Sequence, residues 1–525
     1  MRQHETFVSL DIGTTSIKVV VAEYINGSVN IIGVGNEKSR GLSRGVIVDI
    51  DETVYSIQRA VDQASRKANY QIRSVIVGVP SNQIMIEECH GMVAVASENR
   101  EITNRDVDNV ISAAKVRSVP PERDIISIIP EEFIVDGFNG IKDPRGMLGV
   151  RLELYARLVT GPRTIIHNIK RCVQKAGLEI AELVVQPQAI ASVALSRDER
   201  EFGTVIIDMG GGQTTASIIH DNQLKYTMVD QEGGDFVTKD ISIILNTSIE
   251  SAERIKREYG YAVSADTSDQ EYFPVETVGK KEPVRVDEHF LAEIIEARMV
   301  QIFETLHDEL QRVDGLDLPG GFVMTGGGVS LPGVVELAKR YFGNQIRVFI
   351  PDEMGMRNPI YATSLGLINY VAQLDDIHRI AQGTYSNLAY SNQEMHPPYA
   401  QSRQMEGPVG RSTPAASSQQ SHAQTWRDDD YFSAESEYEQ RNSAEDNRSQ
   451  LTNRFPNLFG QREKNQVRDE QYPYQDYNAY PSSSVRGPVE ESNDYRDNYY
   501  REESYPKDEN NFMARIRNYF NTFFD

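Results

Sequence analysis

The sequence has very few residues suited to disulfide or soft-metal chemistry. Among 525 residues there are only two cysteines, Cys89 and Cys172, and one tryptophan. The two thiols lie far apart in the chain, form no CxxC pair and have no histidine cluster beside them. This pattern excludes a disulfide scaffold and a zinc ribbon. We therefore expect two reduced and largely buried cysteines.

Long apolar runs are also missing. No stretch reaches the roughly 18 apolar residues that a transmembrane helix requires. The first residues, MRQHETFVSLDIG, run straight into a strand pattern and lack the charged and then apolar segments of an export signal. These absences predict a protein that stays in the cytoplasm.

Positive charge is in short supply as well. Lys and Arg number 54 against 77 Asp and Glu, which gives a formal net charge of −23, and no basic stripe interrupts the acidic background. Binding to a nucleic-acid backbone needs clustered Lys and Arg. The composition therefore excludes nucleic acid as a partner.

The composition changes once along the chain. An apolar fraction of 39% is too low for the three well-packed domains that the length alone suggests. Up to about Ile380 the sequence has the apolar periodicity of a folded protein, and from about Ala381 it is polar and of low complexity. A disordered linker is therefore expected over 381–510.

The folded part has the strand and helix patterns of an α/β protein. It opens with strands near 6–13, 16–24 and 29–35, a helix over 51–69 and a buried strand over 74–80. Residues 83–163 show a different pattern of strands around one helix that begins at Thr103 or Asn104, which predicts an inserted α+β subdomain. The first theme then resumes with a helix over 163–177, a strand over 180–186 and a helix after Pro187.

An internal repeat is the most informative feature of the sequence. The stretch GTVIIDMGGGQTTASIIH repeats the layout of TFVSLDIGTTSIKVVVAEY, with an apolar strand that ends in Asp, a Gly-rich turn, a Thr pair and an apolar return strand. Two such copies predict a duplicated core whose two lobes face each other across a cleft.

The turns of the repeat carry groups that bind anions. Small residues let backbone N–H groups approach a phosphate, and hydroxyls add further donors. Asp11 and Asp208 precede the turns and are placed to hold a hydrated Mg²⁺. One such turn alone is more often a plain hairpin turn, but two facing turns predict a clamp for a polyphosphate. The residues concerned are Gly13, Thr14 and Thr15 in the first turn, and Gly210, Gly211, Gly212, Gln213, Thr214 and Thr215 in the second.

A third glycine cluster lies at Gly326, Gly327 and Gly328, between an apolar strand and a helix. Backbone without side chains can lie flat against a planar ligand such as a nucleoside. The alternative is a strand-to-helix turn without a ligand. The phosphate-binding P-loop pattern GxxxxGK[ST] is absent from the chain, so a P-loop nucleotide site is excluded.

Taken in order, the motifs DIGTTSIK, QPQAIAS, DMGGGQTT, AERIKREYG and TGGGVSLPG resemble the actin/Hsp70/sugar-kinase ATPase superfamily. The insertion, the stretch SRGVIVDIDE and the C-terminal tip make the chain similar to the FtsA family of bacterial cell-division proteins. The resemblance covers about residues 5–380 and the tip. It implies a two-lobed actin-like ATPase fold with an inserted α+β subdomain, followed by the linker and an amphipathic helix.

The resemblance also implies domain bounds. These are subdomain 1A over 1–82, 164–195 and 356–380, an inserted SHS2-like subdomain 1C over 83–163, subdomain 2A over 196–230 and 306–355, subdomain 2B over 231–305, the linker over 381–510, and the membrane-targeting helix over 511–525.

Further site residues follow from the resemblance rather than from the patterns. ATP with Mg²⁺ is the implied cofactor, with Lys18 near a phosphate and Glu253 and Lys256 at the ribose and base. Gln186 is implied to orient the attacking water, and Asp208 is the other expected catalytic residue. An amide can orient water but cannot act as a base, so at most slow ATP hydrolysis is expected. The alternatives are a strand-end amide for Gln186 and a helical ion pair for Glu253 and Lys256.

Partners are implied by the resemblance too. The family forms protofilaments, binds the C-terminal peptide of the tubulin-like division GTPase FtsZ on a lobe that corresponds to about 231–305, and contacts later divisome membrane proteins through the inserted subdomain. The implied location is the cytoplasmic side of the cell membrane at the division septum.

The last residues, NFMARIRNYFNTFFD, have the pattern of an amphipathic helix. At 100° per residue the large apolar side chains fall within an arc of about 140°. Arg515 and Arg517 flank this arc, which suits a helix lying in the plane of a membrane surface. Packing on the folded core or in a partner groove are the alternatives. The expected membrane-facing side chains are Phe512, Met513, Ile516, Tyr519, Phe520, Phe523 and Phe524.

Three functions are compatible with these motifs. A polymerising, membrane-tethering scaffold that uses ATP explains the phosphate turns, the linker and the tip together. A small-molecule kinase of the same superfamily explains the turns but gains nothing from a polar tail and a membrane helix. A pilus-assembly protein with a similar core would lack the tip. The sequence therefore favours the scaffold.

Overall fold

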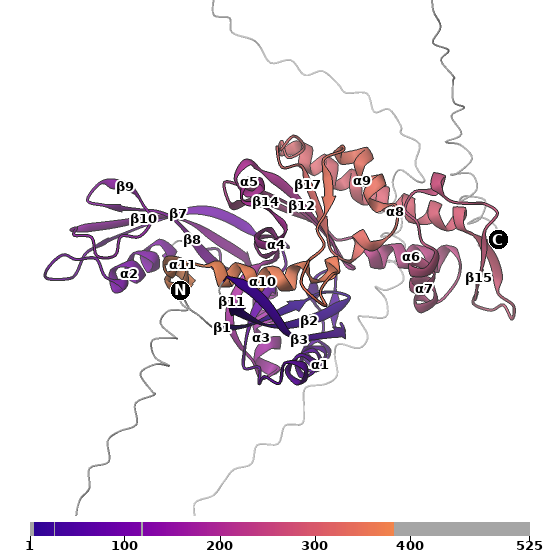
Figure 1. Cartoon of the computed structure of the whole chain (residues 1–525), viewed down its shortest axis with the longest axis horizontal. Coiled ribbons are helices and arrows are strands. Elements are labelled where there is room, and N and C mark those ends of the chain that lie inside the picture. Colours follow the sequence, from indigo (N-terminus) through magenta and orange to yellow (C-terminus); the bar gives the residue numbers. More distant parts are fainter. Residues whose placement is uncertain (1–4, 26, 117–118, 383–525) are drawn as a thin grey trace, which may run out of the picture. The chain divides into compact units, whose positions relative to one another are not determined.

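The computed structural model describes residues 5–25, 27–116 and 119–382. Within them lie two five-stranded sheets, a four-stranded sheet and the helices that cover them (Figure 1). The expected linker beyond residue 382 and the expected helix over 511–525 lie outside the described residues. In the described part of the chain, no helix is long and apolar enough to cross a membrane.

The first five-stranded sheet is built from strands that precede and follow the inserted subdomain in the sequence. Its strands are β1 (Glu5–Ile12), β2 (Ser16–Ile25), β3 (Ser28–Lys38), β6 (Ser74–Val79) and β11 (Glu179–Val185), in the order β3-β2-β1-β6-β11. The pairs β1–β2 and β2–β3 are antiparallel, and β1–β6 and β6–β11 are parallel. Alternate side chains of these strands face α1 (Ile50–Ala68) and α3 (Arg163–Lys175) on one side and α10 (Ala362–Gln373) on the other.

The second five-stranded sheet repeats the first. Its strands are β12 (Thr204–Met209), β13 (Thr214–His220), β14 (Gln223–Asp230), β17 (Phe322–Thr325) and β18 (Ile346–Val348), in the order β14-β13-β12-β17-β18. The sequence of antiparallel and parallel pairs is the same as in the first sheet. This match confirms the duplicated core and the two-lobed, actin-like α/β fold expected from the sequence.

Helices of the second lobe pack on one face of its sheet and share one core. They are α6 (Gly234–Ile244), α7 (Ile249–Tyr259), α8 (Glu288–Arg312) and α9 (Val334–Phe342). The hairpin β15 (Tyr272–Val275) and β16 (Val284–Asp287) joins this core through Phe273 and Val286. The other face of the sheet contacts α4 (Gln186–Ala194), which begins at Gln186 with Pro187 in its first turn, while the short α5 (Arg197–Phe202) leads into β12.

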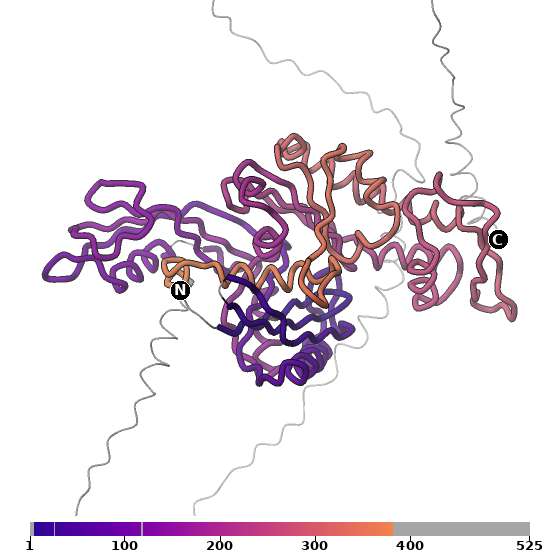
Figure 2. The backbone as a smooth tube through the Cα atoms, viewed as in Figure 1, coloured from indigo at the N-terminus to yellow at the C-terminus, as the bar shows by residue number. Residues whose placement is uncertain are grey.

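The inserted subdomain is an antiparallel sheet with one main helix, as expected. Strands β7 (Met85–Ala94), β8 (Arg123–Val135), β9 (Phe138–Ile141) and β10 (Arg151–Pro162) pair in the order β7-β10-β8-β9. Helix α2 (Asn104–Lys115) covers one face, and Thr103 is its N-cap, with Asp106 completing a capping box. The backbone leaves the first lobe after β6 and returns to it at α3 (Figure 2). Strand β9 has no counterpart among the expected elements.

The start of the expected linker is wrong by at least two residues. Helix α11 (Asp376–Gln382) continues the fold through Ala381, which is fully buried with Ile377 and Ile380 in the core of the inserted subdomain. The Lys115 ammonium donates to the Ala381 carbonyl at 2.8 Å. Apolar residues at i, i+3 and i+4 place one face of this short helix on the subdomain, so the polar tail begins only after it.

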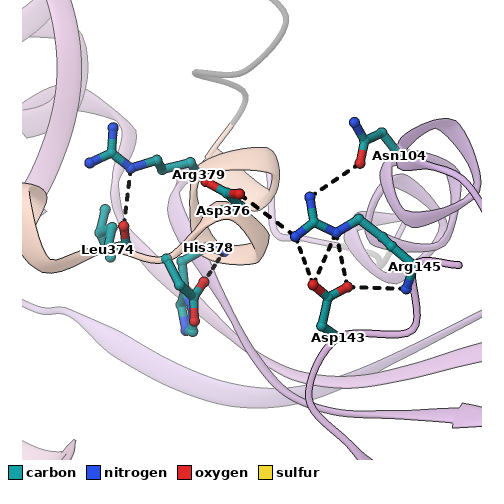
Figure 3. A network of polar contacts seen from close by, with 8 residues as sticks. Asn104, Asp143, Arg145, Leu374, Asp376, His378 and Arg379 are labelled. Carbon is teal, nitrogen blue, oxygen red and sulfur yellow. Dashed lines mark hydrogen bonds and ion pairs between the residues drawn. The ribbon is translucent and has the colours of Figure 1, made fainter. Parts of the chain in front are cut away.

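Charged side chains secure the outer side of α11 (Figure 3). The Arg145 guanidinium lies 3.7 Å from the Asp376 carboxylate and is held by Asp143 at 2.7 Å. It also donates to the Asn104 side chain at 3.3 Å. Residues from α2, from the loop before β10 and from α11 therefore form one polar network around the buried apolar face.

Both cysteines are buried and neither forms a disulfide, as expected. Burial raises the pKa of the Cys172 thiol to about 11. A thiol with so high a pKa stays protonated and unreactive at neutral pH.

Candidate functional site

The two Gly-rich turns of the repeat meet in the structure. A Cβ atom added to Gly211 would lie 1.8 Å from the Thr15 hydroxyl oxygen, and one added to Gly212 would lie 2.6 Å from the Thr14 side chain. The contact is possible only because these positions carry no side chain. A Cβ atom added to Gly13 would lie 2.8 Å from the Ser16 carbonyl oxygen, and one added to Gly210 would lie 2.9 Å from the Gln213 carbonyl oxygen. These two glycines therefore allow a similar close approach within their own turns. The expected juxtaposition of the turns is therefore present.

The remaining residues of the second turn lie in β13. Thr214 and Thr215 are buried, and the Thr214 hydroxyl donates to the Glu232 carbonyl at 2.9 Å. Gln213 is different, because its side-chain oxygen is buried and has no hydrogen-bond partner in the described structure. A buried polar atom of this kind usually marks a ligand or water site.

Asp11 is the centre of a buried polar cluster. Its carboxylate accepts from the Lys18 ammonium at 3.1 Å and from the Gln186 amide at 3.2 Å. Asp11 and Lys18 are direct neighbours across β1 and β2, which explains the short contact. Lys18 is thus neutralised by a protein carboxylate. Gln186 is held at the end of β11, where α4 begins.

Asp208 occupies the corresponding position in the second repeat, at the end of β12. Burial and the nearby negative charge of Asp11 raise the pKa of the Asp208 carboxyl to about 6, while Lys18 acts in the opposite direction. A narrow recess lies beside Asp208, and its polar lining includes Gln186, Ser81 and Thr215. The Ser81 hydroxyl is buried and has no hydrogen-bond partner in the described structure. Both expected catalytic residues therefore line one polar recess.

The third glycine cluster contacts Asp208. Gly326 has a φ of 89°, and an added Cβ atom would lie 2.4 Å from the Asp208 carboxylate. Gly328 lies against Met209, with 2.8 Å between its added Cβ and the Met209 side chain. Gly327 begins a 3-10 helix, η2 (Gly327–Ser330). The cluster therefore contacts the end of β12, where the second Gly-rich turn begins.

Glu253 and Lys256 form an ion pair of 2.6 Å on α7. The Lys256 ammonium also donates to the Gly234 carbonyl at 2.9 Å and to the Thr238 hydroxyl at 2.7 Å. The pKa of the Glu253 carboxyl is lowered, because hydrogen bonds from Lys256 and Thr238 outweigh the opposing effect of burial. The helical ion pair that the sequence offered as an alternative is therefore present, but it joins α7 to α6 rather than facing solvent.

Two segments at the site carry no expected role from the sequence. Asp235, at the start of α6, donates its backbone N–H to the Gly211 carbonyl at 2.8 Å, and its carboxylate is hydrogen-bonded to Thr15. The small hairpin of β4 (Leu42–Ser43) and β5 (Val46–Ile47) contacts the first turn, where the Gly45 N–H donates to the Thr14 hydroxyl at 2.9 Å. The sequence features that could have indicated these two segments are the glycine pair at 233–234 and the Arg-Gly step at 44–45.

The described residues contain no cluster of three or more His, Cys, Asp or Glu side chains able to hold a metal ion. Asp11 and Asp208 remain a pair of carboxylates from the two repeats. Their mutual repulsion contributes to the raised pKa of Asp208. A cation that is also held by another ligand would relieve this repulsion.

Family models match the second lobe and the inserted subdomain. One described as "Cell division protein FtsA" matches residues 205–366, and one described as "SHS2 domain inserted in FTSA" matches residues 81–160. The second match coincides with the inserted subdomain.

Known proteins match over about seven tenths of the chain. Cell division protein FtsA of Enterococcus faecalis is 58% identical over 376 residues, which cover 72% of this chain and 86% of that protein. Cell division protein FtsA of Bacillus subtilis is 48% identical over 373 residues, which cover 71% of this chain and 85% of that protein. Among solved structures, a chain of the PilM-PilN type IV pilus biogenesis complex has a TM-score of 0.49 and 15% identity, and the match covers 70% of this chain and 98% of that chain.

Proposed function

We propose, because the chain belongs to the FtsA family of cell division proteins, that it is an ATP-binding, polymerising protein that tethers FtsZ filaments to the membrane. It would then recruit later divisome membrane proteins for septum formation. The observation that carries the proposal is the meeting of the two Gly-rich turns beside Asp11 and Asp208.

The phosphate chain of ATP fits the two turns. Their backbone N–H groups, with the hydroxyls of Thr14 and Thr15, supply donors without a side chain in the way. The buried, unpartnered oxygen of Gln213 supports a binding site here, since its amide group can turn its N–H donors to an anion. For phosphates to pass between the turns, Thr15 and Gly211 must move apart, because they are in contact. Opening of the two lobes is therefore part of the proposal.

Asp11 and Asp208 fit a hydrated Mg²⁺ that also contacts the phosphates. Mg²⁺ is bound in many nucleotide sites by one or two carboxylates plus phosphate oxygens and waters. The raised pKa of Asp208 supports this role, because two carboxylates with one Lys between them leave negative charge uncompensated. The ion would supply neutralisation of the phosphate charge.

Hydrolysis by this site should be slow. Gln186 lines the recess beside Asp208, which suits a residue that orients water. Its amide nitrogen is already committed to Asp11, and an amide cannot accept the proton of the attacking water. The adenosine would lie near Gly326 to Gly328, with Glu253 and Lys256 on the other side, as in the superfamily that the motifs resemble.

The partner assignments rest on the family. We assign FtsZ peptide binding to residues 231–305, contacts with later division proteins to the inserted subdomain, and self-association into protofilaments to the two lobes. The amphipathic tip would hold the protein at the cytoplasmic side of the membrane at the septum. Tip and linker lie outside the described residues, so these roles depend on their sequence patterns.

Electron microscopy of the full chain with ATP on lipid monolayers tests the proposal. Wild type should form filaments on the lipid, and Phe520→Glu should not be recruited, because it places a charge on the expected apolar face. Asn521→Glu is the matched control, since it adds the same charge on the polar face and should leave recruitment intact. No filaments with ATP, or unchanged recruitment of Phe520→Glu, would contradict the proposal.

A further inference from the structure

The hairpin of β4 and β5 has an unusual turn at its tip. Each strand has two residues, with Leu42 opposite Ile47 and Ser43 opposite Val46. The two turn residues, Arg44 and Gly45, both have positive φ, at 51° and 74°. Such turns favour Asn-Gly sequences, so an arginine in the left-handed region is strained. Strain of this kind often marks a functional position.

The tip contacts both groups that would bind phosphate. The Gly45 N–H donates to the Thr14 hydroxyl of the first turn. On the second turn, Gln213 packs so closely that a Cβ atom added to Gly45 would lie 2.1 Å from its side-chain oxygen. That oxygen is the buried atom without a hydrogen-bond partner. The hairpin tip therefore closes the space where the two turns meet.

Arg44 brings positive charge to this place. Its guanidinium lies 5.3 Å from the centre of the Phe236 ring, at the start of α6. Arg298 lies 5.8 Å from the same ring, but Glu232 and Asp240 neutralise it, each at 2.6 Å. Arg44 forms no ion pair with any residue that the structure describes. It is thus a half-buried cation that lies against an aromatic ring, and a phosphate is a stronger partner than such a ring.

Apolar side chains line a narrow recess beneath the hairpin. They are Leu42 and Ile47 of the hairpin, Ile12 of β1, and Ile165 and Ile169 of α3. The base of the hairpin is fixed, because the N–H groups of Val48 and Asp49 both donate to the Gly41 carbonyl. The base of the hairpin is therefore held in place, and its two-residue tip makes the contacts to both turns.

We propose that Arg44 and the backbone N–H of Gly45 bind the terminal phosphate of a nucleoside triphosphate. This inference rests on the proposed nucleotide site and adds a third binding element to its two turns. On binding, the Gly45 N–H exchanges the Thr14 hydroxyl for a phosphate oxygen, and the Arg44 guanidinium leaves the Phe236 ring. Thr14 and Gln213 are then released to the phosphates as well. A nucleoside diphosphate lacks the terminal phosphate that the hairpin binds. The hairpin therefore contacts a bound triphosphate but not a bound diphosphate.

Titration calorimetry of the full chain, with Mg²⁺ and either ADP or a non-hydrolysable ATP analogue, tests the assignment. Arg44→Asn removes the guanidinium and keeps a residue that tolerates positive φ, so the turn survives. Loss of a charge-assisted hydrogen bond should weaken analogue binding about tenfold or more. ADP affinity should change less than about twofold, since no contact to it is removed. Arg44→Lys should recover part of the loss.

Arg40→Asn is the matched control. Arg40 precedes the hairpin and lies 3.8 Å from Glu52, with its side chain largely exposed, so this variant should bind both nucleotides as wild type does. Equal weakening of ADP and analogue by Arg44→Asn would mean a structural role and overturn the assignment, as would no weakening of either. If wild type binds neither nucleotide, the proposed nucleotide site itself fails. If wild type binds both nucleotides and Arg44→Asn binds them equally well, the proposed role of the hairpin fails but the nucleotide site stands.

Discussion

Asp230 lies at the end of β14 with a pKa raised to about 6, because it is buried and close to the charge of Glu232. Between its ordinary pKa of 3.8 and this value, the folded state holds a proton that the unfolded state has lost. Stability from this group is therefore complete below about pH 4, falls as the pH rises to about 6 and stays low above it.

Asp230→Asn should accordingly raise the free energy of unfolding at pH 7.5 by about 2 kcal/mol, with partial solvent screening taken into account. At pH 4.5 the gain should be much smaller. Urea denaturation at the two pH values measures it, and Asp269→Asn, at an exposed loop position, is the control. An equal effect of Asp230→Asn at both pH values would contradict the charge explanation.

Gly326 supports a sharper test of the site. Gly326→Ala and Gly343→Ala both place a side chain at positive φ, 89° and 80°, which costs each variant about 1 kcal/mol. Only at Gly326 does the new Cβ atom meet other groups, the Asp208 carboxylate at 2.4 Å and the Met209 carbonyl at 2.6 Å, because Gly343 has no atom within 4 Å of it. Gly326→Ala should therefore lose binding of Mg²⁺-nucleotide by about tenfold or more, whereas Gly343→Ala keeps it. Calorimetry measures the nucleotide affinity of both variants. Equal affinities would show that nucleotide binding does not depend on the contact between Gly326 and Asp208.

Residue patterns predicted some of the site and missed the rest for a physical reason. The two acids and the first glycine of each turn were predictable because the duplication repeats the Asp-x-Gly step with the same spacing. The partner of Thr14 was not, because Gly45 lies 31 residues away and only the tertiary fold brings it there. For Glu253 and Lys256 the spacing of three residues predicted an ion pair, whereas the contacts to Gly234 and Thr238 again depend on the packing of α6 against α7.

At the scale of elements, length decided what the sequence could predict. Strands of six residues or more and the long helices show enough apolar periodicity to be recognised. Strands β4 and β5 have two residues each and β9 has four, too few for a period to be seen. Helix α11 has seven residues at the start of the polar tail, and its apolar face is satisfied only by the distant inserted subdomain.

Helix α11 should be held to the inserted subdomain mainly by apolar burial. Ile380→Asp puts a charge into the core beside α2, and the lost burial is worth about 2 kcal/mol or more. Hydrogen–deuterium exchange measured by mass spectrometry should then rise over 376–382 and over α2, and stay unchanged in α8. Asp376→Ala, on the exposed side of the same helix, removes one long ion pair and should have little effect. Exchange over 376–382 that does not rise in Ile380→Asp would show that polar contacts hold the helix.

At the scale of the molecule, the two repeats are joined by a shared core. Ile190 of α4 packs in the same apolar cluster as Val77 of the first sheet and Ile206 of the second. The duplication could be predicted from the sequence. The contact of α4 with both sheets could not, because the sequence indicates only that a helix follows Pro187. Helix α4 therefore contacts both sheets and also lines the recess beside Asp208.

The C-terminal tip gives a prediction about the whole assembly. Its arginines, Arg515 and Arg517, are opposed by Asp525 and by acidic residues just upstream, so its membrane affinity should depend on aromatic burial and be as weak as that of a single acyl chain, about 10⁴ M⁻¹. A polymer that presents many tips binds by avidity, and a monomer does not. Binding of the full chain to liposomes should therefore rise steeply with protein concentration.

Residues 511–525 fused to a monomeric fluorescent protein are the matched control for avidity. The fusion presents one tip per particle, so its binding should follow a simple hyperbola at about 10⁴ M⁻¹. Cosedimentation over a range of protein concentrations compares the two, and the full chain with ATP should reach half-maximal binding at a concentration at least about tenfold lower than the fusion. A hyperbolic curve for the full chain with the same midpoint would mean that each tip acts alone, and that membrane attachment does not report assembly.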